Sequence, residues 1–347
     1  MNALSPFGWA YAAGAGLRNA LYDRKWFEVH SLGAPVISVG NITAGGTGKT
    51  PVVALVTELL AENGEHVCIL TRGYGRREPG KRVVVSDGSS ILADAETGGD
   101  EPVELARRLA GTAVIIADAD RVAAAKFARE EFGVTCFVLD DGFQHRRAAR
   151  DLDIVCIDAT DPFGGGELIP AGRLRESPAN LRRADAIIIT KAEAGTDIGK
   201  LEQEIKWLAP AAAVFRAESS ISGFVELSAF LEGGQKGRPP ALPGPAFAFC
   251  GLGNPEHFFA TLRRAGAELA ATQAFRDHHR YTAADIDRLT ASAKAAGATA
   301  FVTTAKDAVK LEPELFSLPC FVAELGTAVL PAEAFQALVL DAVQENR

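Results

Sequence analysis

Short apolar runs alternate with helix-like segments along the first part of the chain. Runs of strand length recur at residues 35–39, 66–70, 83–85, 113–117, 136–139, 154–157 and 186–189. Nearly continuous apolar strands separated by helices are typical of a parallel sheet that is covered on both faces. The pattern therefore predicts a doubly wound parallel α/β domain, which we place at residues 32–215.

The pattern changes after this domain. Two short β-like pieces, at residues 213–217 and 223–227, precede a stretch rich in Gly and Pro at residues 233–245. Gly and Pro interrupt both helices and strands. We therefore predict a hinge or linker over residues 216–245.

A second, smaller α/β domain is predicted over residues 246–347. Strand-like apolar runs occur there at residues 246–250, 299–303 and 320–323. Between the first two runs, Thr282 and Asp285 have the spacing of a capping box, which predicts the start of a helix.

Residues 1–31 are predicted to form an amphipathic helix. Residues 1–17 carry no charged side chain and the basic residues follow them, whereas a signal peptide has its basic residues first. The stretch is also shorter than the roughly 20 apolar residues that span a bilayer. Aromatic and basic side chains gather at Trp9, Tyr11, Arg18, Tyr22, Arg24, Lys25 and Trp26. Such a helix either lies in a membrane interface or packs on the protein core, and the residues leave both open.

The composition is that of a soluble globular protein. Of the 347 residues, 48% are hydrophobic and 23% are charged, which allows a sizeable core. The formal net charge of −8 argues against nucleic acid as a partner. Basic residues cluster locally at 72–82, 146–150 and 173–183, which suits either a small anionic ligand or a solvated face. The cysteines have no CxxC spacing, so neither disulfides nor a zinc site are predicted.

A glycine-rich loop follows the first predicted strand. It reads GNITAGGTGKT over residues 40–50, and a helix is expected from Pro51. Glycines let backbone N–H groups turn toward phosphate oxygens, and the helix N-terminus favours an anion. Lys49 is expected to reach the β- and γ-phosphates, and Thr50 to bind Mg²⁺. The motif departs from a strict P-loop because Thr43 stands where glycine is usual. The nucleotide-binding residues are predicted to be Gly45, Gly46, Thr47, Gly48, Lys49 and Thr50.

Paired acids end another predicted strand. Asp140 and Asp141 follow the apolar run at 136–139, which is the form of a Walker B motif. A carboxylate at that position can hold Mg²⁺ directly or through water. Gln144 and His145 come directly after, at the edge of the sheet where ligands of α/β proteins bind.

Asp100 allows two interpretations. It stands just before Pro102 at the start of a predicted helix, where an aspartate commonly caps the helix. A carboxylate can also accept the proton of an attacking hydroxyl group. Asp277 and His278, much later in the chain, read by themselves as part of a polar loop.

Taken together, these segments resemble the tetraacyldisaccharide 4′-kinase family, the lipid A 4′-kinases. The matching stretches appear in order over residues 38–310, and Ala305 departs from an expected acid. In this family the position of Thr43 is not glycine, so that departure no longer counts against nucleotide binding. The stretches are SVGNITAGGTGKTP (38–51), TRGYGR (71–76), GDEP (99–102), LDDGFQHR (139–146), PAGRLRE (170–176), DHH (277–279) and TTAKDAVK (303–310).

The resemblance implies an ATP- and Mg²⁺-dependent kinase that acts on the 4′-hydroxyl of a lipid disaccharide 1-phosphate. It also implies a peripheral or monotopic position at the cytoplasmic face of the bacterial inner membrane. It makes Asp100 a catalytic base paired with His278. It makes Thr50, Asp140 and Asp141 the metal ligands, and Arg72, Arg121 and His145 candidate substrate contacts. The expected partners are the lipid A precursor and a membrane surface, with no protein partner evident.

Two other functions stay open. A P-loop GTPase or other NTPase needs a base-reading Asn-Lys-x-Asp, for which residues 190–193, TKAE, are a poor match. A non-catalytic nucleotide-binding scaffold needs neither Asp100 nor His278.

Overall fold

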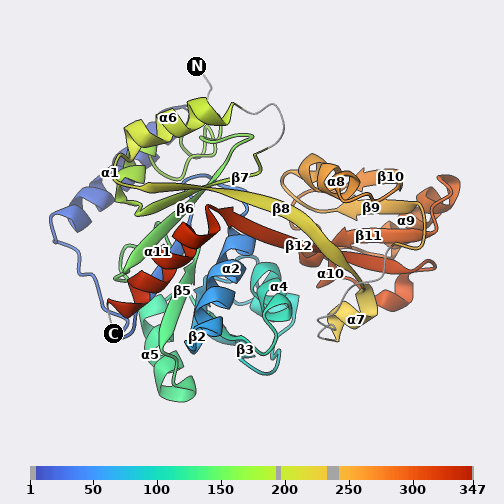
Figure 1. Ribbon diagram of the computed structural model, residues 1–347, viewed down its shortest axis with the longest axis horizontal. Coiled ribbons are helices and arrows are strands. Elements are labelled where there is room, and N and C mark those ends of the chain that lie inside the picture. Colours follow the sequence, from blue (N-terminus) through green and yellow to red (C-terminus); the bar gives the residue numbers. More distant parts are fainter. Residues whose placement is uncertain (1–4, 193–196, 233–241, 346–347) are drawn as a thin grey trace.

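One twisted sheet runs through both lobes of the molecule (Figure 1). The computed structural model describes residues 5–192, 197–232 and 242–345, and in this part of the chain the sheet has twelve strands. Their order is β10-β9-β11-β12-β8-β7-β6-β1-β5-β2-β4-β3. The strands are β1 (Val36–Gly40), β2 (Val67–Thr71), β3 (Val83–Asp87), β4 (Ala113–Ala117), β5 (Cys136–Asp140), β6 (Leu152–Asp158), β7 (Ala186–Thr190), β8 (Ala213–Glu226), β9 (Ala246–Cys250), β10 (Leu269–Ala274), β11 (Ala300–Thr304) and β12 (Cys320–Leu330).

The first lobe contains the part of the sheet from β8 to β3. Its strands are parallel except for β3, which pairs antiparallel with β4 at the edge. Every residue of β1, β2, β4 and β5 is buried, so both faces of these strands need apolar side chains. The predicted doubly wound parallel fold is confirmed, and each predicted run lies within two residues of an observed strand.

Helices cover both faces of this half of the sheet. α2, α4 and α11 pack on one face, in front of the strands in Figure 1, while α5 and α6 pack on the other. The helices are α1 (Ser5–Asp23), α2 (Lys49–Glu62), α3 (Ala95–Gly98), α4 (Asp100–Arg108), α5 (Arg121–Phe132), α6 (Ile198–Leu208), α7 (Leu227–Leu231), α8 (Pro255–Arg264), α9 (Ala283–Ala295), α10 (Ala305–Ala308) and α11 (Ala332–Gln344), with 3₁₀ turns at Pro178–Arg183 and Pro313–Leu315.

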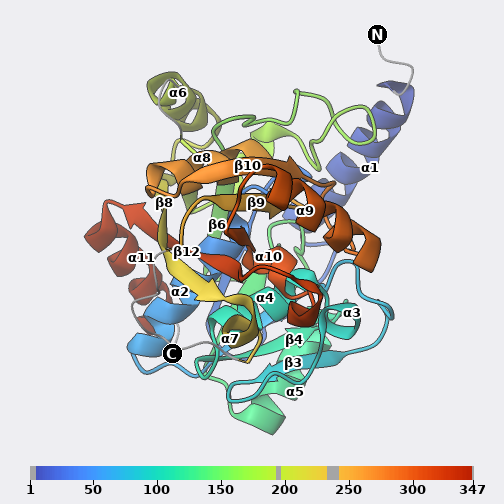
Figure 2. The same ribbon diagram turned by 90° about the vertical axis from the view of Figure 1, so that its right-hand side faces the viewer.

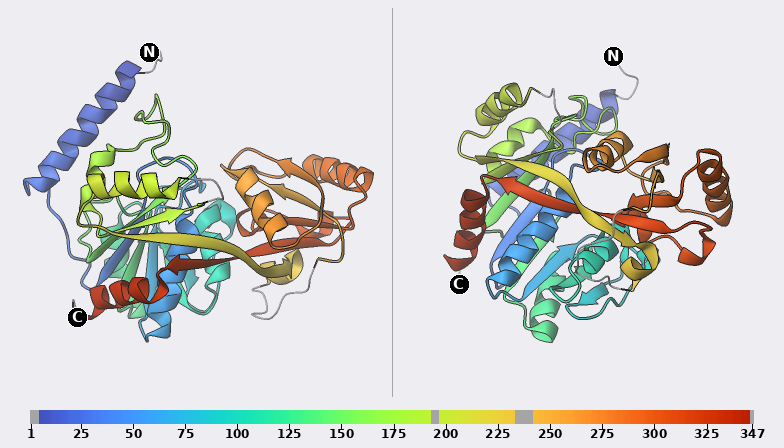
Figure 3. Two further views of the ribbon diagram at one scale, coloured as in Figure 1. Left: turned by 45° about the horizontal axis from the view of Figure 1, so that its top comes forward. Right: turned by 45° about the vertical axis from the view of Figure 1, so that its right-hand side comes forward.

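A long antiparallel pair of strands joins the two lobes. β8 and β12 run side by side from the first lobe into the second (Figures 1 and 3). The prediction of a linker over residues 216–245 is therefore wrong for 216–231, which form most of β8 and then α7. Buried and exposed residues alternate along much of β8, so its sequence carries no continuous apolar run. Residues 233–241, the Gly- and Pro-rich stretch, lie outside the described part of the chain.

The second lobe, which faces the viewer in Figure 2, is built on β9, β10, β11 and part of β12. α8 packs on one face of these strands, and α7, α9 and α10 pack on the other. β9 and β11 are buried along their whole length, and the predicted second α/β unit contains both. β10 was not predicted, because as an edge strand it has no buried residue and no apolar pattern.

The last helix returns to the first lobe. Phe335 of α11 lies in the main core of that lobe, and its ring centroid is 5.3 Å from that of Phe215. The predicted range of the second domain, residues 246–347, thus includes a helix that packs on the first lobe. An amphipathic pattern shows that a helix has a buried face but does not show which sheet covers it.

α1 lies at the outer edge of the first lobe (Figure 3). Tyr11 and Leu17 on this helix are exposed, as are Trp26 and Phe27 just after it. Within the described ranges, every helix is too short or too polar to cross a membrane.

Candidate active site

The loop between β1 and α2 is held in shape by neighbouring strands. The Asn41 side-chain amide donates to Thr47 Oγ1 at 2.8 Å, and the Thr190 hydroxyl donates to the Thr47 carbonyl oxygen at 2.8 Å. Gly45 and Gly48 have φ of 112° and 75°, values that side chains disfavour. The N-cap of α2, Gly48, makes no side-chain hydrogen bond to the helix, so the first N–H groups are left for an anion. The predicted phosphate loop is therefore preshaped in this structure.

Lys191, at the end of β7, also supports this loop. Its ammonium group donates to the Gly46 carbonyl oxygen and lies 2.7 Å from Asp158 Oδ2. Lys191 has a φ of 52°, which is unusual for a residue with a side chain. Residues 190 and 191 were considered for guanine recognition, but their described contacts hold the phosphate loop. Glu193, the last residue of that motif, lies outside the described residues.

Lys49 and Asp141 form an ion pair at the centre of the site. Lys49 Nζ lies 3.4 Å from Asp141 Oδ1, and Arg175 Nη1 donates to both Asp141 oxygens at 2.8 and 2.6 Å. Burial alone raises the pKa of Asp141, but Lys49 and Arg175 outweigh burial and hold the pKa at about 2. Asp141 is therefore an anion at neutral pH and links the phosphate loop to the segment that carries Arg175.

The residues expected to hold Mg²⁺ supply oxygen atoms on neighbouring elements. Asp140 is buried at the end of β5 and accepts a hydrogen bond from Thr71 Oγ1 at 2.9 Å. Burial, followed by the charges of Glu101 and Asp141, raises the pKa of Asp140. A divalent cation would relieve this crowding of acids. Carboxylate and hydroxyl oxygens, completed by phosphate oxygens and water, are the ligands that Mg²⁺ prefers. Asp140, Asp141 and Thr50 therefore fit the cation.

Asp100 and His278 meet across the two lobes. Asp100 begins α4 in the first lobe, and His278 lies in the loop between β10 and α9, where its φ is 57°. His278 Nδ1 is 3.2 Å from Asp100 Oδ2. Burial alone raises the pKa of Asp100, but the hydrogen bond from His278 and the charge of Lys310 outweigh burial and lower the pKa below its usual value. Asp100 is thus held as a carboxylate beside the imidazole.

The structure speaks against one of the two interpretations of Asp100. Gly99, not Asp100, is the N-cap of α4, and it makes no side-chain cap hydrogen bond. The cap in this region is Asp94, which accepts from the Thr97 amide at 2.9 Å at the start of the short α3. The capping interpretation of Asp100 is therefore wrong. Gly99 has a φ of 96°, and a Cβ there would lie 3.1 Å from the Tyr74 carbonyl oxygen, so this turn requires glycine.

Two lysines complete the cluster around this pair. Lys306 Nζ lies 2.9 Å from Asp277 Oδ1 and 3.3 Å from His278 Nε2, and Lys310 Nζ lies 3.5 Å from Asp100 Oδ2. Both lysine side chains are largely buried. Their motif, TTAKDAVK, is one of the stretches that carry the family resemblance, but neither lysine was predicted to have a role. The signal in the sequence that could have identified these lysines is their spacing of four residues directly after a buried strand, where ligands of α/β proteins bind.

The three candidate substrate contacts lie near one another. Arg121 is buried at the start of α5. Among the described residues, it forms no ion pair with a carboxylate within 4 Å. Burial lowers the pKa of Arg121 and outweighs the charges of Asp140 and Asp141, which act in the opposite direction. His145 Nε2 is buried and has no hydrogen-bond partner among the described residues. Burial and then the charge of Arg121 lower the pKa of His145 to about 4. A buried arginine beside an unpaired imidazole nitrogen suits an anionic or hydroxylated ligand.

A cavity of about 770 Å³ lies between the lobes. Gly48 and Thr50 line it from the first lobe, and Asn254, Asp277 and Lys306 line it from the second. This volume is in the range of small-molecule and cofactor sites. Chemical groups from both lobes therefore face one space that is large enough for a nucleotide.

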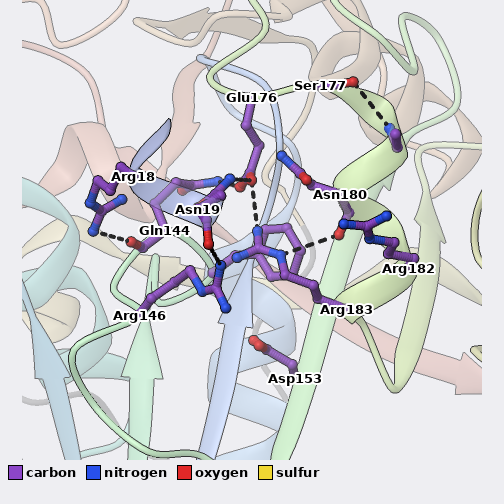
Figure 4. Close-up of polar contacts among 12 residues, drawn as sticks. Arg18, Asn19, Gln144, Arg146, Asp153, Glu176, Ser177, Asn180, Arg182 and Arg183 are labelled. Carbon is purple, nitrogen blue, oxygen red and sulfur yellow. Dashed lines mark hydrogen bonds and ion pairs between the residues drawn. The ribbon is translucent and has the colours of Figure 1, made fainter. Parts of the chain in front are cut away.

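Polar contacts hold the second half of α1 against the first lobe (Figure 4). Asn19 Nδ2 donates to Glu176 Oε2 at 3.2 Å, and Gln144 Nε2 donates to Glu176 Oε1 at 2.8 Å. Arg146 donates to the Asn19 carbonyl oxygen at 2.9 Å and to Asp23 Oδ1 at 2.7 Å. The side chain of Trp9 lies outside the described residues. α1 thus docks on the protein at one end while presenting exposed aromatic and aliphatic groups.

Comparison with known proteins agrees with this geometry. The profile of the family described as tetraacyldisaccharide-1-P 4′-kinase matches residues 1–344. The tetraacyldisaccharide 4′-kinase of Syntrophus aciditrophicus is 40% identical over 349 aligned positions, which cover 99% of this chain and 93% of the relative. The enzyme of the same name from Geobacter metallireducens is 44% identical, with 89% and 88% of the two chains covered. The crystal structure of the "apo" form of LpxK from Aquifex aeolicus in complex with ATP superposes with a TM-score of 0.77 and 29% identity over 98% of both chains.

Proposed function

The chain belongs to the tetraacyldisaccharide-1-P 4′-kinase family, and from this premise we propose that it transfers the γ-phosphoryl group of ATP to the 4′-hydroxyl of a tetraacyldisaccharide 1-phosphate. Its activity is that of an ATP-dependent kinase of lipid A biosynthesis. The observation that carries the proposal for the site is the Asp100–His278 pair at 3.2 Å, formed across the lobes beside the phosphate loop. A nucleotide-binding scaffold without catalysis has no need of such a pair.

The first lobe supplies the nucleotide half of the site. We assign the triphosphate to the loop from Gly45 to Thr50, with Lys49 neutralising phosphate charge. Arg175 and Lys49 both pair with Asp141, so phosphates that enter the site compete for these two cations. Thr50, Asp140 and Asp141 are the residues that would hold Mg²⁺, which when bound neutralises charge on the β- and γ-phosphates.

The second lobe supplies the proton acceptor. Asp100 has a lowered pKa and is therefore a weak base, whereas imidazole is the side chain that ordinarily exchanges protons near neutral pH. We assign the base to His278 Nε2, oriented through Nδ1 by Asp100. The proton of the acceptor hydroxyl passes to Nε2 while the hydroxyl oxygen forms its bond to the γ-phosphorus. The bond from that phosphorus to the bridging oxygen of the β-phosphate breaks, and ADP leaves.

The acceptor subsite is assigned to Arg72, Arg121 and His145. Arg121 is only 5% exposed, and the described carboxylates that act on its charge, Asp140 and Asp141, do not form an ion pair with it, so an acidic group of the acceptor would supply a close counter-charge. His145 Nε2 can exchange a hydrogen bond with a sugar hydroxyl or phosphate. These residues follow β2, β4 and β5, three adjacent strands of the sheet.

We also propose that α1 holds the enzyme at the cytoplasmic face of the inner membrane. A multiply acylated acceptor stays in the bilayer, because each buried methylene group is worth about 0.8 kcal/mol. Trp26 is 74% exposed and Leu17 is 62% exposed, which is unfavourable in water and favourable in a membrane interface. Arg24 and Lys25 stand beside them, near where anionic headgroups would lie. The contacts of Asn19 and Arg146 keep this helix next to the lobe that binds the nucleotide.

One assay separates this function from the two alternatives. Nucleotide consumption is measured with ATP or GTP, in the presence and absence of a lipid disaccharide 1-phosphate in detergent micelles. ATP consumption that requires the acceptor and yields a bisphosphorylated lipid supports the kinase. GTP hydrolysis without an acceptor favours a GTPase, and binding without turnover of either nucleotide favours a scaffold.

A further inference from the structure

Lys306 lies where it restricts the protonation state of His278. It belongs to the short helix α10, which directly follows β11. Its Nζ lies 3.3 Å from His278 Nε2 and 2.9 Å from Asp277 Oδ1, and its side chain is only 11% exposed. Burial alone lowers the pKa of Lys306, but the carboxylates of Glu101 and Asp277 outweigh burial and raise the pKa. The group that faces Nε2 is therefore an ammonium ion.

Hydrogen-bond chemistry then selects one tautomer of the imidazole. An ammonium ion has three donors and no lone pair, so the ring nitrogen opposite it must accept. A neutral imidazole carries one N–H, which must therefore sit on Nδ1. Nδ1 faces Asp100 Oδ2 at 3.2 Å, and an ionised carboxylate can only accept. Both neighbours of the ring thus require the same form, with the proton on Nδ1 and the lone pair on Nε2.

Charges from several elements face this ring. Asp100 and Glu101 come from α4, Asp277 precedes His278 in its own loop, and Lys306 and Lys310 come from α10 and the residues after it. The ring of Tyr74 lies on another side, with its centroid 5.8 Å away. Asp277 Oδ2 is 4.0 Å from Nε2, which makes it a competing acceptor that favours a proton on that nitrogen. Lys306 pairs with this carboxylate and also contacts Nε2, so it offsets the charge of the competing acceptor.

We infer that Lys306 is a positioning residue, which keeps the proton of His278 on Nδ1 and opposes protonation of Nε2. The inference rests on the proposed function in that Nε2 is the atom assigned to receive the proton of the acceptor. Lys306 also occupies the position next to Nε2. The acceptor hydroxyl must therefore displace its Nζ before it can reach the base. The lone pair of Nε2 is thus oriented for the acceptor hydroxyl before the acceptor arrives.

Nitrogen NMR measures the tautomer directly. The full-length protein is labelled with ¹⁵N-histidine, and the His278 signals are assigned by comparison with His278→Gln. In the neutral ring, the native protein should show a protonated Nδ1 and an unprotonated Nε2. In Lys306→Met, which keeps the length of the side chain without its charge, signal should move toward protonated Nε2. A native ring with its proton on Nε2, or a tautomer that is unchanged in Lys306→Met, would overturn the inference.

The pH dependence of turnover provides the second measurement. In Lys306→Met the carboxylate of Asp277 loses its lysine partner and the positive charge beside Nε2 is gone, so the acid limb of the kcat profile should move up by about one pH unit. That shift lowers kcat about tenfold on the acid limb. The KM for ATP should stay within about twofold, because the lysine acts on the base. A large rise in the KM for ATP with an unmoved acid limb would make Lys306 a phosphate ligand and would also overturn the inference.

Two further variants control for general damage to the cluster. Lys306→Arg keeps the charge and should retain most of the native acid limb. Lys306→Met combined with Asp277→Asn removes the lysine and its competing carboxylate together, and should return the profile toward the native one. This double variant also avoids a buried unpaired carboxylate if Lys306→Met alone unfolds. Full activity in His278→Gln would remove the proposed base, whereas the tautomer measured by NMR would still test the effect of Lys306.

Discussion

His278 Nδ1 lies 3.2 Å from Asp100 Oδ2, although 178 residues separate the two in the chain. The contact depends on the second lobe lying against the start of α4. Both side chains are partly buried there, with 30% and 18% of their surface exposed, so solvent screens the interaction only in part. The pair therefore forms only in an arrangement in which the two lobes meet.

Replacement of Asp100 by asparagine should separate catalysis from stability. Asparagine keeps the size of the side chain but loses the charge that orients and stabilises the imidazole. We expect kcat to fall by at least about a hundredfold, with little change in melting temperature because Asp100 is not a cap. Asp94→Ala is the matched control, since Asp94 is the cap of α3. It should lose about 1 kcal/mol of stability while turnover stays normal. Normal turnover in Asp100→Asn would return that residue to a structural role.

Replacement of Lys49 by alanine tests the phosphate loop. The loss of a cation that neutralises the triphosphate should lower kcat/KM by several orders of magnitude. Asp141 also loses one of its two partners, but Arg175 remains bound to it, so the fold should survive. Circular dichroism checks the fold, and Lys294→Ala, at an exposed position on α9, is the control. Near-normal turnover by folded Lys49→Ala protein would contradict the assigned nucleotide site.

Replacement of Arg121 by methionine tests the acceptor subsite. A hydrogen bond to a charged group contributes about 1.5–3 kcal/mol, so the KM for the lipid acceptor should rise between about tenfold and a hundredfold. The KM for ATP should change little. The melting temperature should not fall, because the change removes a buried cation that has no close carboxylate among the described residues. Lys126→Met, exposed on the same helix, is the control. If instead the KM for ATP rises and that for the lipid does not, Arg121 belongs to the nucleotide half.

His145 should make the stability depend on pH. Its pKa is lowered from 6.5 to about 4, first by burial and then by Arg121, so the folded protein binds this proton less readily than the unfolded chain. The contribution of His145 to the stability of the fold is fully present above pH 6.5 and is lost as the pH falls toward about 4. The size of this loss is on the order of 2–3 kcal/mol. Urea unfolding across this range should show a flatter dependence for His145→Asn. The exposed His66→Asn variant should keep the native slope, and equal slopes for all three proteins would contradict the prediction.

Replacement of Leu17 and Trp26 by serine tests the membrane contact. Both side chains are exposed, so the folded protein should keep its stability. Binding to vesicles that contain anionic lipid should weaken, and the apparent KM for the lipid acceptor should rise while that for ATP stays unchanged. The charges of residues 1–31 nearly balance, with three basic against two acidic side chains, so added salt should matter little. Trp207→Ser, on α6 and 81% exposed, is the matched control. Unchanged vesicle binding would place the membrane contact elsewhere.

Local sequence determined much of the first lobe. Strands such as β1 and β5 are buried on both faces, so they need apolar residues at every position and are visible as continuous runs. The glycine loop before Lys49 and the acids after β5 follow such strands directly. The topology of a parallel sheet then brings their ends to one edge. These parts of the site were predicted because each depends on a few consecutive residues.

Only the tertiary structure decided the rest. β8 was predicted only as two short β-like pieces because only part of it is buried. The range predicted for the second domain included α11, which packs on the first lobe, because the local sequence of a helix does not show which sheet covers it. The contacts of Arg175 with Asp141 and of Lys306 with His278 join residues 34 and 28 positions apart. A lysine or arginine in a sequence shows that a charge is present, but its effect depends on the distance to groups on other elements and on the water that burial removes. The folded lobes set both quantities, and therefore set which nitrogen of His278 carries the proton.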